Sequence, residues 1–256
     1  ACPWDCQVAR PALTGFLILR DSSRHAVIAS CNYSARKTLM NVSDAMTARK
    51  SIRAFTDEPI ANEVLESLLA KAARAPSGGN VQPWRIFVIN GDAMSRFRQV
   101  VREKRAPEPA EYAIYPDGLK DPYRTARFNV GEQMYALLNI PREDKPARLR
   151  RLAENFNFFG APAAIFCYVD RQMGPPQWSD LGMFLQSFML LATEAGYGTC
   201  AQEAWANRAQ TVTEFVEADP SLMLFCGIAI GKTDPTAPVN SLVSDRFTPS
   251  EFATFV

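Results

Sequence analysis

Two arginines and a serine alternate along one short segment of the chain. Arg49, Ser51 and Arg53 occupy every second position, so an extended backbone would direct all three side chains to one face. A helix would still place Arg49 and Arg53 on one face, at i and i+4. In both cases two guanidiniums and a hydroxyl converge, as the binding of a phosphate monoester requires, and Lys50 adds a further positive charge. Taken by itself, the segment is equally typical of a solvated basic patch.

A second segment whose residue types could bind a ligand lies between Pro76 and Pro83. It contains Gly78 and Gly79, which allow the backbone to approach a ligand closely. It also carries polar side chains that could bind the edge of a polar ring, namely Ser77, Asn80 and Gln82. An ordinary connection between a helix and a strand would not need so many polar side chains between two prolines.

The composition limits the other chemistry that is available. The chain has 256 residues, of which 47% are hydrophobic and 21% charged, a balance typical of ordinary globular proteins. Its net charge of +1 provides no bulk field for nucleic acid or an anionic membrane. The single histidine, His25, argues against histidine-rich zinc sites, Ser-His-Asp hydrolysis and Cys-His proteolysis. We predict no metal site.

The cysteines and the N-terminal segment bear on the cellular compartment. The six cysteines form no CxxC pair, which favours a reducing compartment. No apolar run reaches the length of a membrane span. Arg20, Asp21 and Arg24 lie where a signal peptide should be apolar. We therefore predict a cytoplasmic protein, in which residues 1–39 are a peripheral or weakly ordered extension and residues 40–256 are the functional domain.

Two glycine-rich segments resemble nucleotide-binding motifs but lack the required context. Residues 196–201 fit the GxGxxG/A dinucleotide pattern, yet a predicted helix precedes them where that motif needs a strand. Residues 227–233 are one residue short of a P-loop, and Cys226 stands where the first glycine belongs. We interpret the second segment as the end of a strand followed by Lys232, a solvated charge.

Helix and strand signals alternate along the chain and would position these segments. A helix is predicted from Asn62, its cap, to no further than Ala75, because Pro76 disfavours helical geometry in the residue before it. Strands are predicted at residues 84–89, 163–169 and 222–230, and a short helix at residues 210–218. The sequence shows no internal repeat or linker, so we expect one α+β domain.

Residues 180–195 form the most apolar predicted helix, with Ser179 as its N-cap and Gly196 as its stop. Because its apolar residues lie nearly all round, it must be covered on every side, in a large core or at a subunit interface. Residues 105–125 are rich in proline, tyrosine and charge, and we expect a long excursion such as a lid or binding loop. The apolar pattern at residues 251–256 suggests a docked C-terminal tail.

Together, the arginine segment and the glycine loop resemble the FMN-dependent nitroreductase family. The resemblance rests on Arg-x-Ser-Ile-Arg-x-Phe at residues 49–55 and Ala-Pro-Ser-Gly-x-Asn-x-Gln-Pro-Trp at residues 75–84. Three further segments follow in the family's order, at residues 158–162, 196–203 and 227–246. The resemblance covers roughly residues 42–256. Each of the five motifs is loose by itself, but the five together, in the family's order, are specific to this family. The excursion, with its tyrosines and Arg127, further resembles the nitrobenzoate-reductase branch.

The resemblance implies a nitroreductase-like α+β fold, with a mixed central sheet flanked by helices. It implies a homodimer with two FMN sites at an interface built around the long buried helix. Three groups of residues would bind the cofactor. The phosphate and ribityl chain would be held by Arg49, Lys50, Ser51, Arg53 and Arg246. The flavin of the opposite subunit would be reached by Pro76, Ser77, Gly78 and Asn80. The pyrimidine edge and N5 would lie near Gln202 and Glu203, largely at backbone groups. Ser244 stands near the place of a second basic residue that the family often has before Arg246.

The implied activity is an NAD(P)H-dependent reduction of nitroaromatic compounds, nitrobenzoate-like, to hydroxylamines by a ping-pong mechanism. No side chain would be catalytic, because N5 of the FMN carries the hydride. Tyr112, Tyr115 and Tyr123 are candidates to stack on the substrate. The alternatives are a quinone reductase, flavin reductase or reductive dehalogenase on the same fold, a non-catalytic FMN-binding protein, and a flavin-free interaction domain. The expected partners are a second copy of the chain and a small nitroaromatic or quinone substrate, with no nucleic acid and no membrane.

Overall fold

The computed structural model describes residues 40–104 and 106–256. The predictions for the extension at residues 1–39, including His25 and Cys31, lie outside the described residues. No helix of the described residues is long and apolar enough to cross a membrane.

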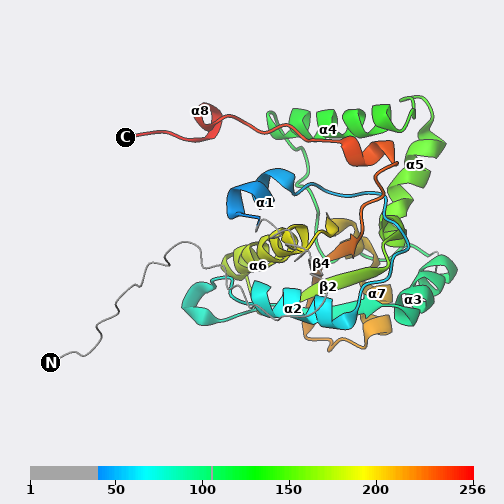
Figure 1. Cartoon of the computed structure of the whole chain (residues 1–256), viewed down its shortest axis with the longest axis vertical. Coiled ribbons are helices and arrows are strands. Elements are labelled where there is room, and N and C mark those ends of the chain that lie inside the picture. The colour runs from blue at the N-terminus through cyan, green and yellow to red at the C-terminus, as the bar shows by residue number, and fades with distance from the viewer. Residues whose placement is uncertain (1–39, 105) are drawn as a thin grey trace, which may run out of the picture. The chain divides into compact units, whose positions relative to one another are not determined.

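A four-stranded sheet forms the centre of the domain (Figure 1). Its strands are β1 (Arg85–Asn90), β2 (Ala163–Asp170), β3 (Gly198–Gln202) and β4 (Leu222–Gly231), in the order β1-β2-β4-β3. All three strand pairs are antiparallel. In the described residues, the only parallel pairing is an isolated bridge between Ser51 and Thr199 at the β3 edge. The expected mixed sheet therefore reduces, within this chain, to an antiparallel sheet with one parallel contact.

The helices cover both faces of this sheet. They are α1 (Val42–Ala48), α2 (Asn62–Ala72), α3 (Asp92–Glu103), α4 (Tyr123–Leu137), α5 (Lys145–Ala153), α6 (Pro175–Glu194), α7 (Ala209–Val216) and α8 (Pro249–Phe252). Short 3₁₀ turns complete the fold: η1 (Gly78–Asn80), η2 (Glu154–Gly160), η3 (Glu203–Arg208) and η4 (Pro238–Ser241). The predicted α+β class is confirmed.

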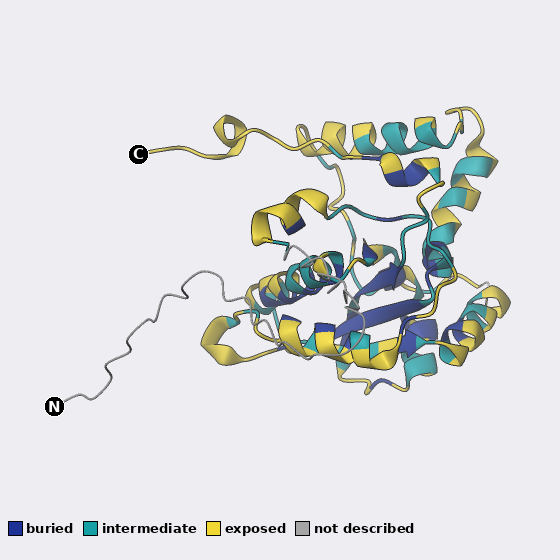
Figure 2. Ribbon diagram, in the orientation of Figure 1, coloured by how far each residue is buried: buried dark blue, intermediate teal, exposed yellow. Residues whose placement is uncertain are grey.

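The alternation of side chains along β2 divides the core into two layers. Ile165 and Cys167 face the cluster that includes Leu68 of α2 and Phe188 of α6. Phe166 faces the other cluster, which includes Phe97 of α3 and the fully buried Trp205 of η3. Burial is therefore concentrated in the sheet and in the inner sides of these helices, whereas α4 contains no buried residue (Figure 2). A strand buried on both faces reads as a continuous apolar run, which is why β2 was predictable from sequence.

One predicted helix cap and one predicted helix start are wrong. Helix α2 begins at Asn62, as predicted, but Asn62 does not cap it, and its Oδ1 accepts a hydrogen bond from Asn90 instead. Helix α6 begins at Pro175, four residues before the predicted cap, because prolines fit the first turn of a helix. Ser179 is therefore an interior residue, and its hydroxyl donates to the carbonyl of Pro176. The predicted stop of α6 is confirmed, since Gly196 adopts a φ of 79°.

Within this chain, helix α6 is not buried on every side, which differs from the expectation. Leu181, Phe184 and Phe188 are buried, but Met183 is 38% exposed. The C-terminal residues are also exposed, with Phe255 at 91%, so within this chain the predicted docking of the tail is wrong. Figure 1 shows the tail running past α4 and away from the sheet. A single chain thus leaves both apolar surfaces open to solvent.

Candidate functional site

The segment that carries Arg49, Ser51 and Arg53 is extended and crosses the edge of the sheet. The amide of Ile52 donates to the carbonyl of Thr199 at 2.8 Å, and the amide of Arg53 donates to Oδ1 of Asn240 at 2.8 Å. Asn240 is buried and its Nδ2 donates to the carbonyl of Ala54 at 2.8 Å. We call residues 49–56 the arginine strap. Its extended conformation places Ser51 and Arg53 on one side, as the alternation predicted.

Four guanidiniums gather around this strap and form what we call the arginine cluster, namely Arg49, Arg53, Arg151 and Arg246. Burial and the nearby charge of Arg246 lower the pKa of Arg49. Arg151 reaches the strap from α5, where its Nη2 donates to the carbonyl of Arg53 at 2.9 Å. Arg246 donates to Oγ of Ser244 at 2.7 Å. Ser244 thus orients the guanidinium of Arg246.

The arginine cluster keeps its positive charge without an ion-pair partner in the part of the chain that the structure describes. None of its members forms an ion pair with a carboxylate among residues 40–104 and 106–256. Nε of Arg151 is buried and has no hydrogen-bond partner there. Burial lowers the pKa of Arg151 further, in opposition to the nearby Glu154. Because unpaired, partly desolvated guanidiniums repel one another, the arrangement is suited to an anion with several oxygen atoms.

Cys200 lies beneath the cluster and is buried. Burial raises the pKa of its thiol, although the charges of Arg53, Arg151 and Arg49 act in the opposite direction. The thiol is therefore near three of the four guanidiniums, which locates the centre of positive charge at the β3 edge of the sheet.

A cavity of about 640 Å³ extends from Arg53 along the end of β3. Ala201, Glu203 and Ala204 line one part of it, and residues of α4 and the preceding loop line another. This volume is in the range of small-molecule and cofactor sites. Partial desolvation raises the pKa of the Glu203 carboxyl. The cavity thus joins a cationic end to a wall of peptide groups and apolar side chains.

Gln202, between two residues that line the cavity, has its side chain engaged within the fold. Its side chain is buried, and Nε2 donates to the carbonyl of Asn155 at 2.7 Å. Its Oε1 accepts a hydrogen bond from Trp205 at 3.4 Å. The side-chain amide therefore joins η2 to η3, and a role for residues 202–203 through main-chain groups stays a prediction.

The glycine loop lies at a different place, beside the first half of α6. The amide of Gly78 donates to both carboxylate oxygens of Asp180 at 3.3 Å, and the amide of Gln82 donates to Oγ of Ser77 at 3.0 Å. Gly79 and Asn80 adopt positive φ values of 55° and 58°. Pro76, Gly78 and Asn80 are exposed. Within the described residues, no recorded interaction joins this loop to the arginine cluster, and Lys50 is half-buried in the strap.

The three tyrosines proposed to stack on a substrate separate in the structure. Tyr115 lines the cavity, and the guanidinium of Arg127 lies 3.9 Å from its ring centroid. Tyr112 packs beside Trp178 and donates to the carbonyl of Phe225, and burial raises the pKa of its hydroxyl. Tyr123, at the start of α4, is 63% exposed. The geometry thus leaves Tyr115 as the tyrosine that lines the cavity.

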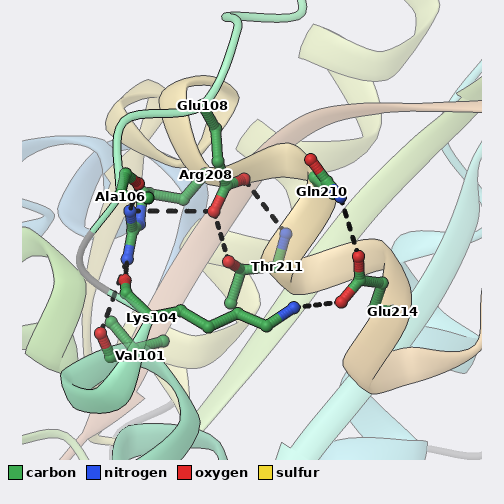
Figure 3. Close-up of polar contacts among 8 residues, drawn as sticks. All are labelled: Val101, Lys104, Ala106, Glu108, Arg208, Gln210, Thr211 and Glu214. Atoms are coloured by element: carbon green, nitrogen blue, oxygen red, sulfur yellow. Dashed lines mark hydrogen bonds and ion pairs between the residues drawn. The ribbon is translucent and has the colours of Figure 1, made fainter.

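A polar network fixes the base of the excursion to the core (Figure 3). Arg208 donates to the carbonyl of Ala106 at 2.7 Å and forms an ion pair with Glu108 at 3.7 Å. Glu108 also accepts from the amide of Thr211 at 3.0 Å, at the start of α7. A second anchor joins Glu111 to Arg171 through two hydrogen bonds of 2.7 and 2.8 Å. The excursion is therefore fixed at residues 106–112, and its tip faces the cavity.

Sequence reasoning missed Arg151 and the anchoring role of Asn240. Arg151 stands in a basic run, residues 148–151, that resembles the solvated end of a helix. Asn240 lies nearly two hundred residues from the strap that it holds. Only the fold brings them to the site, so neither gives a local signal in the sequence.

Comparison with known proteins gives consistent matches. A sequence model described as "Nitroreductase family" matches residues 46–232. The chain is 33% identical to a nitrobenzene nitroreductase of Ectopseudomonas oleovorans, over 84% of this chain and 96% of that protein. It is 34% identical to a 4-nitrobenzoate reductase of Pseudomonas putida, over 83% and 95%. The solved FMN and NADPH-dependent nitroreductase NfnB from sphigopyxis sp. strain HMH superposes with a TM-score of 0.81 at 42% identity, covering 84% of this chain and 99% of that one.

Proposed function

The chain belongs to the nitroreductase family, and from this premise we propose that it uses NAD(P)H and FMN to reduce nitrobenzoate-like compounds to hydroxylamines. The predicted family and the predicted class, an NAD(P)H-dependent FMN oxidoreductase, are confirmed by the family match and by the solved nitroreductase. The nitrobenzoate-like substrate follows from the two relatives that act on nitrobenzene and 4-nitrobenzoate.

The observation that carries the proposal is the uncompensated arginine cluster at one end of a cofactor-sized cavity. These residues fit FMN, because its phosphate needs several hydrogen-bond donors and its ring needs a flat, partly apolar wall. The unpartnered Nε of Arg151 and the unpaired guanidinium of Arg49 are the donors that an added anion would use. We propose that Arg49, Lys50, Ser51, Arg53 and Arg246 hold the phosphate and ribityl chain. We place the backbone of residues 202–203 beside the flavin ring.

A homodimer would supply the remaining contacts. No interaction joins the glycine loop to the arginine cluster among the described residues of one chain, and α6 leaves Met183 exposed. We propose that α6 packs against its symmetry mate, so that Pro76, Ser77, Gly78 and Asn80 reach the flavin of the other subunit. An isologous interface would also cover the apolar side of α6.

When bound, FMN would supply the hydride chemistry, and the protein would supply placement and electrostatics. The guanidiniums of the cluster would fix the phosphate, and the end of β3 would fix the ring. The segment at residues 113–122 would restrict the entry of water to the cavity. We propose that NAD(P)H and the nitroaromatic occupy the same part of the cavity in turn, which gives ping-pong kinetics.

The visible spectrum of the purified protein, before and after anaerobic addition of NADPH, tests this proposal first. We expect flavin bands that bleach, and then return when 4-nitrobenzoate is added, with the hydroxylamine as the product by chromatography. Bands that bleach but return faster with a quinone or free flavin would assign the activity to that acceptor instead. A protein that stays colourless after incubation with FMN would overturn the proposal.

A further inference from the structure

Arg127 stands apart from the other arginines around α4. Arg124 forms an ion pair with Asp121, and Arg148 forms an ion pair with Glu132. Arg127 is exposed and has no ion pair or hydrogen bond with any residue that the structure describes, and its guanidinium lies over the ring of Tyr115. The ring fixes the position of the guanidinium, because a cation over an aromatic face is attracted to it. The N–H donors of Arg127 therefore remain available to a ligand.

The surroundings of Arg127 are those of a site for an aromatic molecule. It lines the same cavity as Glu203, together with the apolar side chains of Ile114, Val130 and Met134. It also lines a neighbouring cavity of about 560 Å³ that Arg246 borders. Arg53 lines the far end of the first cavity, so Arg127 supplies a second guanidinium beside its apolar wall. Such an arrangement is suited to a flat ring that carries an anionic substituent.

We infer that Arg127 is a specificity-determining residue that selects nitroaromatic compounds bearing a carboxylate. This inference rests on the proposed function, since it assigns the recognition of the substrate at the same cavity. The planar guanidinium, which remains charged throughout the physiological pH range, can bind a carboxylate through two parallel hydrogen bonds. Tyr115 is the platform that holds it. Glu203 lines the same cavity, and its carboxylate would repel an anionic substrate, which the guanidinium of Arg127 would offset.

The decisive experiment compares 4-nitrobenzoate with its uncharged, nearly isosteric amide, 4-nitrobenzamide. The FMN-loaded full chain and its Arg127→Met and Arg127→Lys variants are assayed with both compounds. We expect Arg127→Met to lower the kcat/KM ratio of acid to amide at least tenfold, mainly through KM. Arg127→Lys should give an intermediate ratio, because it keeps the charge but loses the planar fork. The matched control is Arg124→Met, one turn away on α4, which should leave the ratio at the wild-type value.

Two further measurements separate this role from others. Spectral titration of the bound flavin with benzoate and benzamide, which are not reduced, should show the same loss of preference. The dissociation constant of FMN should stay within threefold of wild type in Arg127→Met, and a larger change would assign Arg127 to the cofactor and overturn the inference. A lost preference for NADPH over NADH, with an unchanged acid-to-amide ratio, would assign it to the dinucleotide phosphate and also overturn it.

The failure of the inference and the failure of the proposed function have different signatures. If wild type reduces both nitro compounds but Arg127→Met and Arg127→Lys keep the wild-type ratio, Arg127 does not select the carboxylate and the proposed function stands. If the FMN-loaded wild type reduces neither compound, the proposed function fails, and the inference fails with it.

Discussion

Two groups of partly buried arginines in this molecule differ in what surrounds them. At the base of the excursion, the side chain of Arg208 is only 12% exposed and faces the Glu108 carboxylate, which is 9% exposed, and several backbone carbonyls. In the arginine cluster, Arg49, Arg53 and Arg151 face one another and a buried thiol, with no ion-pair partner among the described residues. The residue type is the same, but one group completes its bonds within the fold and the other does not.

This difference separates a structural role from a binding role. A buried guanidinium with a full set of acceptors stabilises the fold when its partner is retained. A group of unpaired guanidiniums opposes folding through mutual repulsion, and this cost is offset only when an anion binds. The number of carboxylates around each arginine therefore distinguishes ligand-binding arginines from structural ones better than the number of arginines does.

The largest expected effect follows from the removal of two members of the cluster. In Arg49→Ala/Arg53→Ala, we expect the affinity for FMN to fall roughly 100-fold or more, because each charge-assisted hydrogen bond contributes about 1.5–3 kcal/mol. The melting temperature of the FMN-free chain should not fall, because repulsion between guanidiniums is relieved. Flavin fluorescence titration and thermal unfolding measure both quantities. Retention of wild-type affinity would show that the phosphate lies elsewhere.

The reverse pattern is expected at the structural group. Arg208→Met leaves the Glu108 carboxylate buried without its partner, which should lower the free energy of unfolding by about 3 kcal/mol. That corresponds to a decrease in melting temperature of roughly 6–12 °C for a domain of this size. FMN affinity at low temperature should be retained. The double variant Glu108→Gln/Arg208→Met should recover part of the loss, and failure to do so would show that the ion pair is not the cause.

Substitution of Arg151 tests whether this residue belongs to the arginine cluster or to the structural arginines. It binds the carbonyl of Arg53, as a structural arginine would, yet its Nε has no partner in the described part of the chain. If it belongs to the cluster, Arg151→Met should weaken FMN binding about tenfold, the equivalent of one charge-assisted hydrogen bond. Arg151→Lys should restore part of that affinity and its dependence on salt. A loss of thermal stability with unchanged FMN affinity would place Arg151 in the structural group.

The smallest expected effect concerns Glu203, a carboxylate with no guanidinium partner in the described residues, unlike Glu108. Desolvation raises its pKa, so its charged form is disfavoured in the fold. As the pH falls toward this raised pKa, the carboxyl takes up a proton and its repulsion of an anionic substrate disappears. The KM for 4-nitrobenzoate should fall about two- to threefold relative to 4-nitrobenzamide as the pH is lowered from 8 toward 5.

The same raised pKa has a consequence for stability. The folded chain binds more protons than the unfolded chain between the unfolded and the folded pKa values of Glu203, so its contribution to stability decreases as the pH rises through that interval. Glu203→Gln should remove both pH dependences. A pH-dependent KM ratio that persists in this variant would contradict the assignment.

Many elements of this fold could be predicted from the local sequence. The apolar runs of β2 and β4, the end of α2 before Pro76 and the stop of α6 at Gly196 follow from side-chain and backbone preferences within a few residues. The arrangement of side chains along the arginine strap could also be predicted, because alternation in an extended segment places Ser51 and Arg53 on one side wherever that segment lies. Helices α3, α4 and α5 were missed, although α3 has an apolar side that buries Met94 and Phe97.

Tertiary structure alone decided which polar side chains are free to bind. Gln202 was predicted to act largely at its backbone, and the fold shows what its side chain does, because Asn155 and Trp205 occupy the amide. Of Arg151 and Arg208, only Arg208 forms an ion pair among the described residues, with Glu108, which lies a hundred residues away in the chain. Hydrogen bonds and ion pairs of this kind depend on distances of a few ångströms between segments remote in sequence. The sequence by itself determined the types and local order of the binding groups, and the fold determined which of their bonds were left unmade.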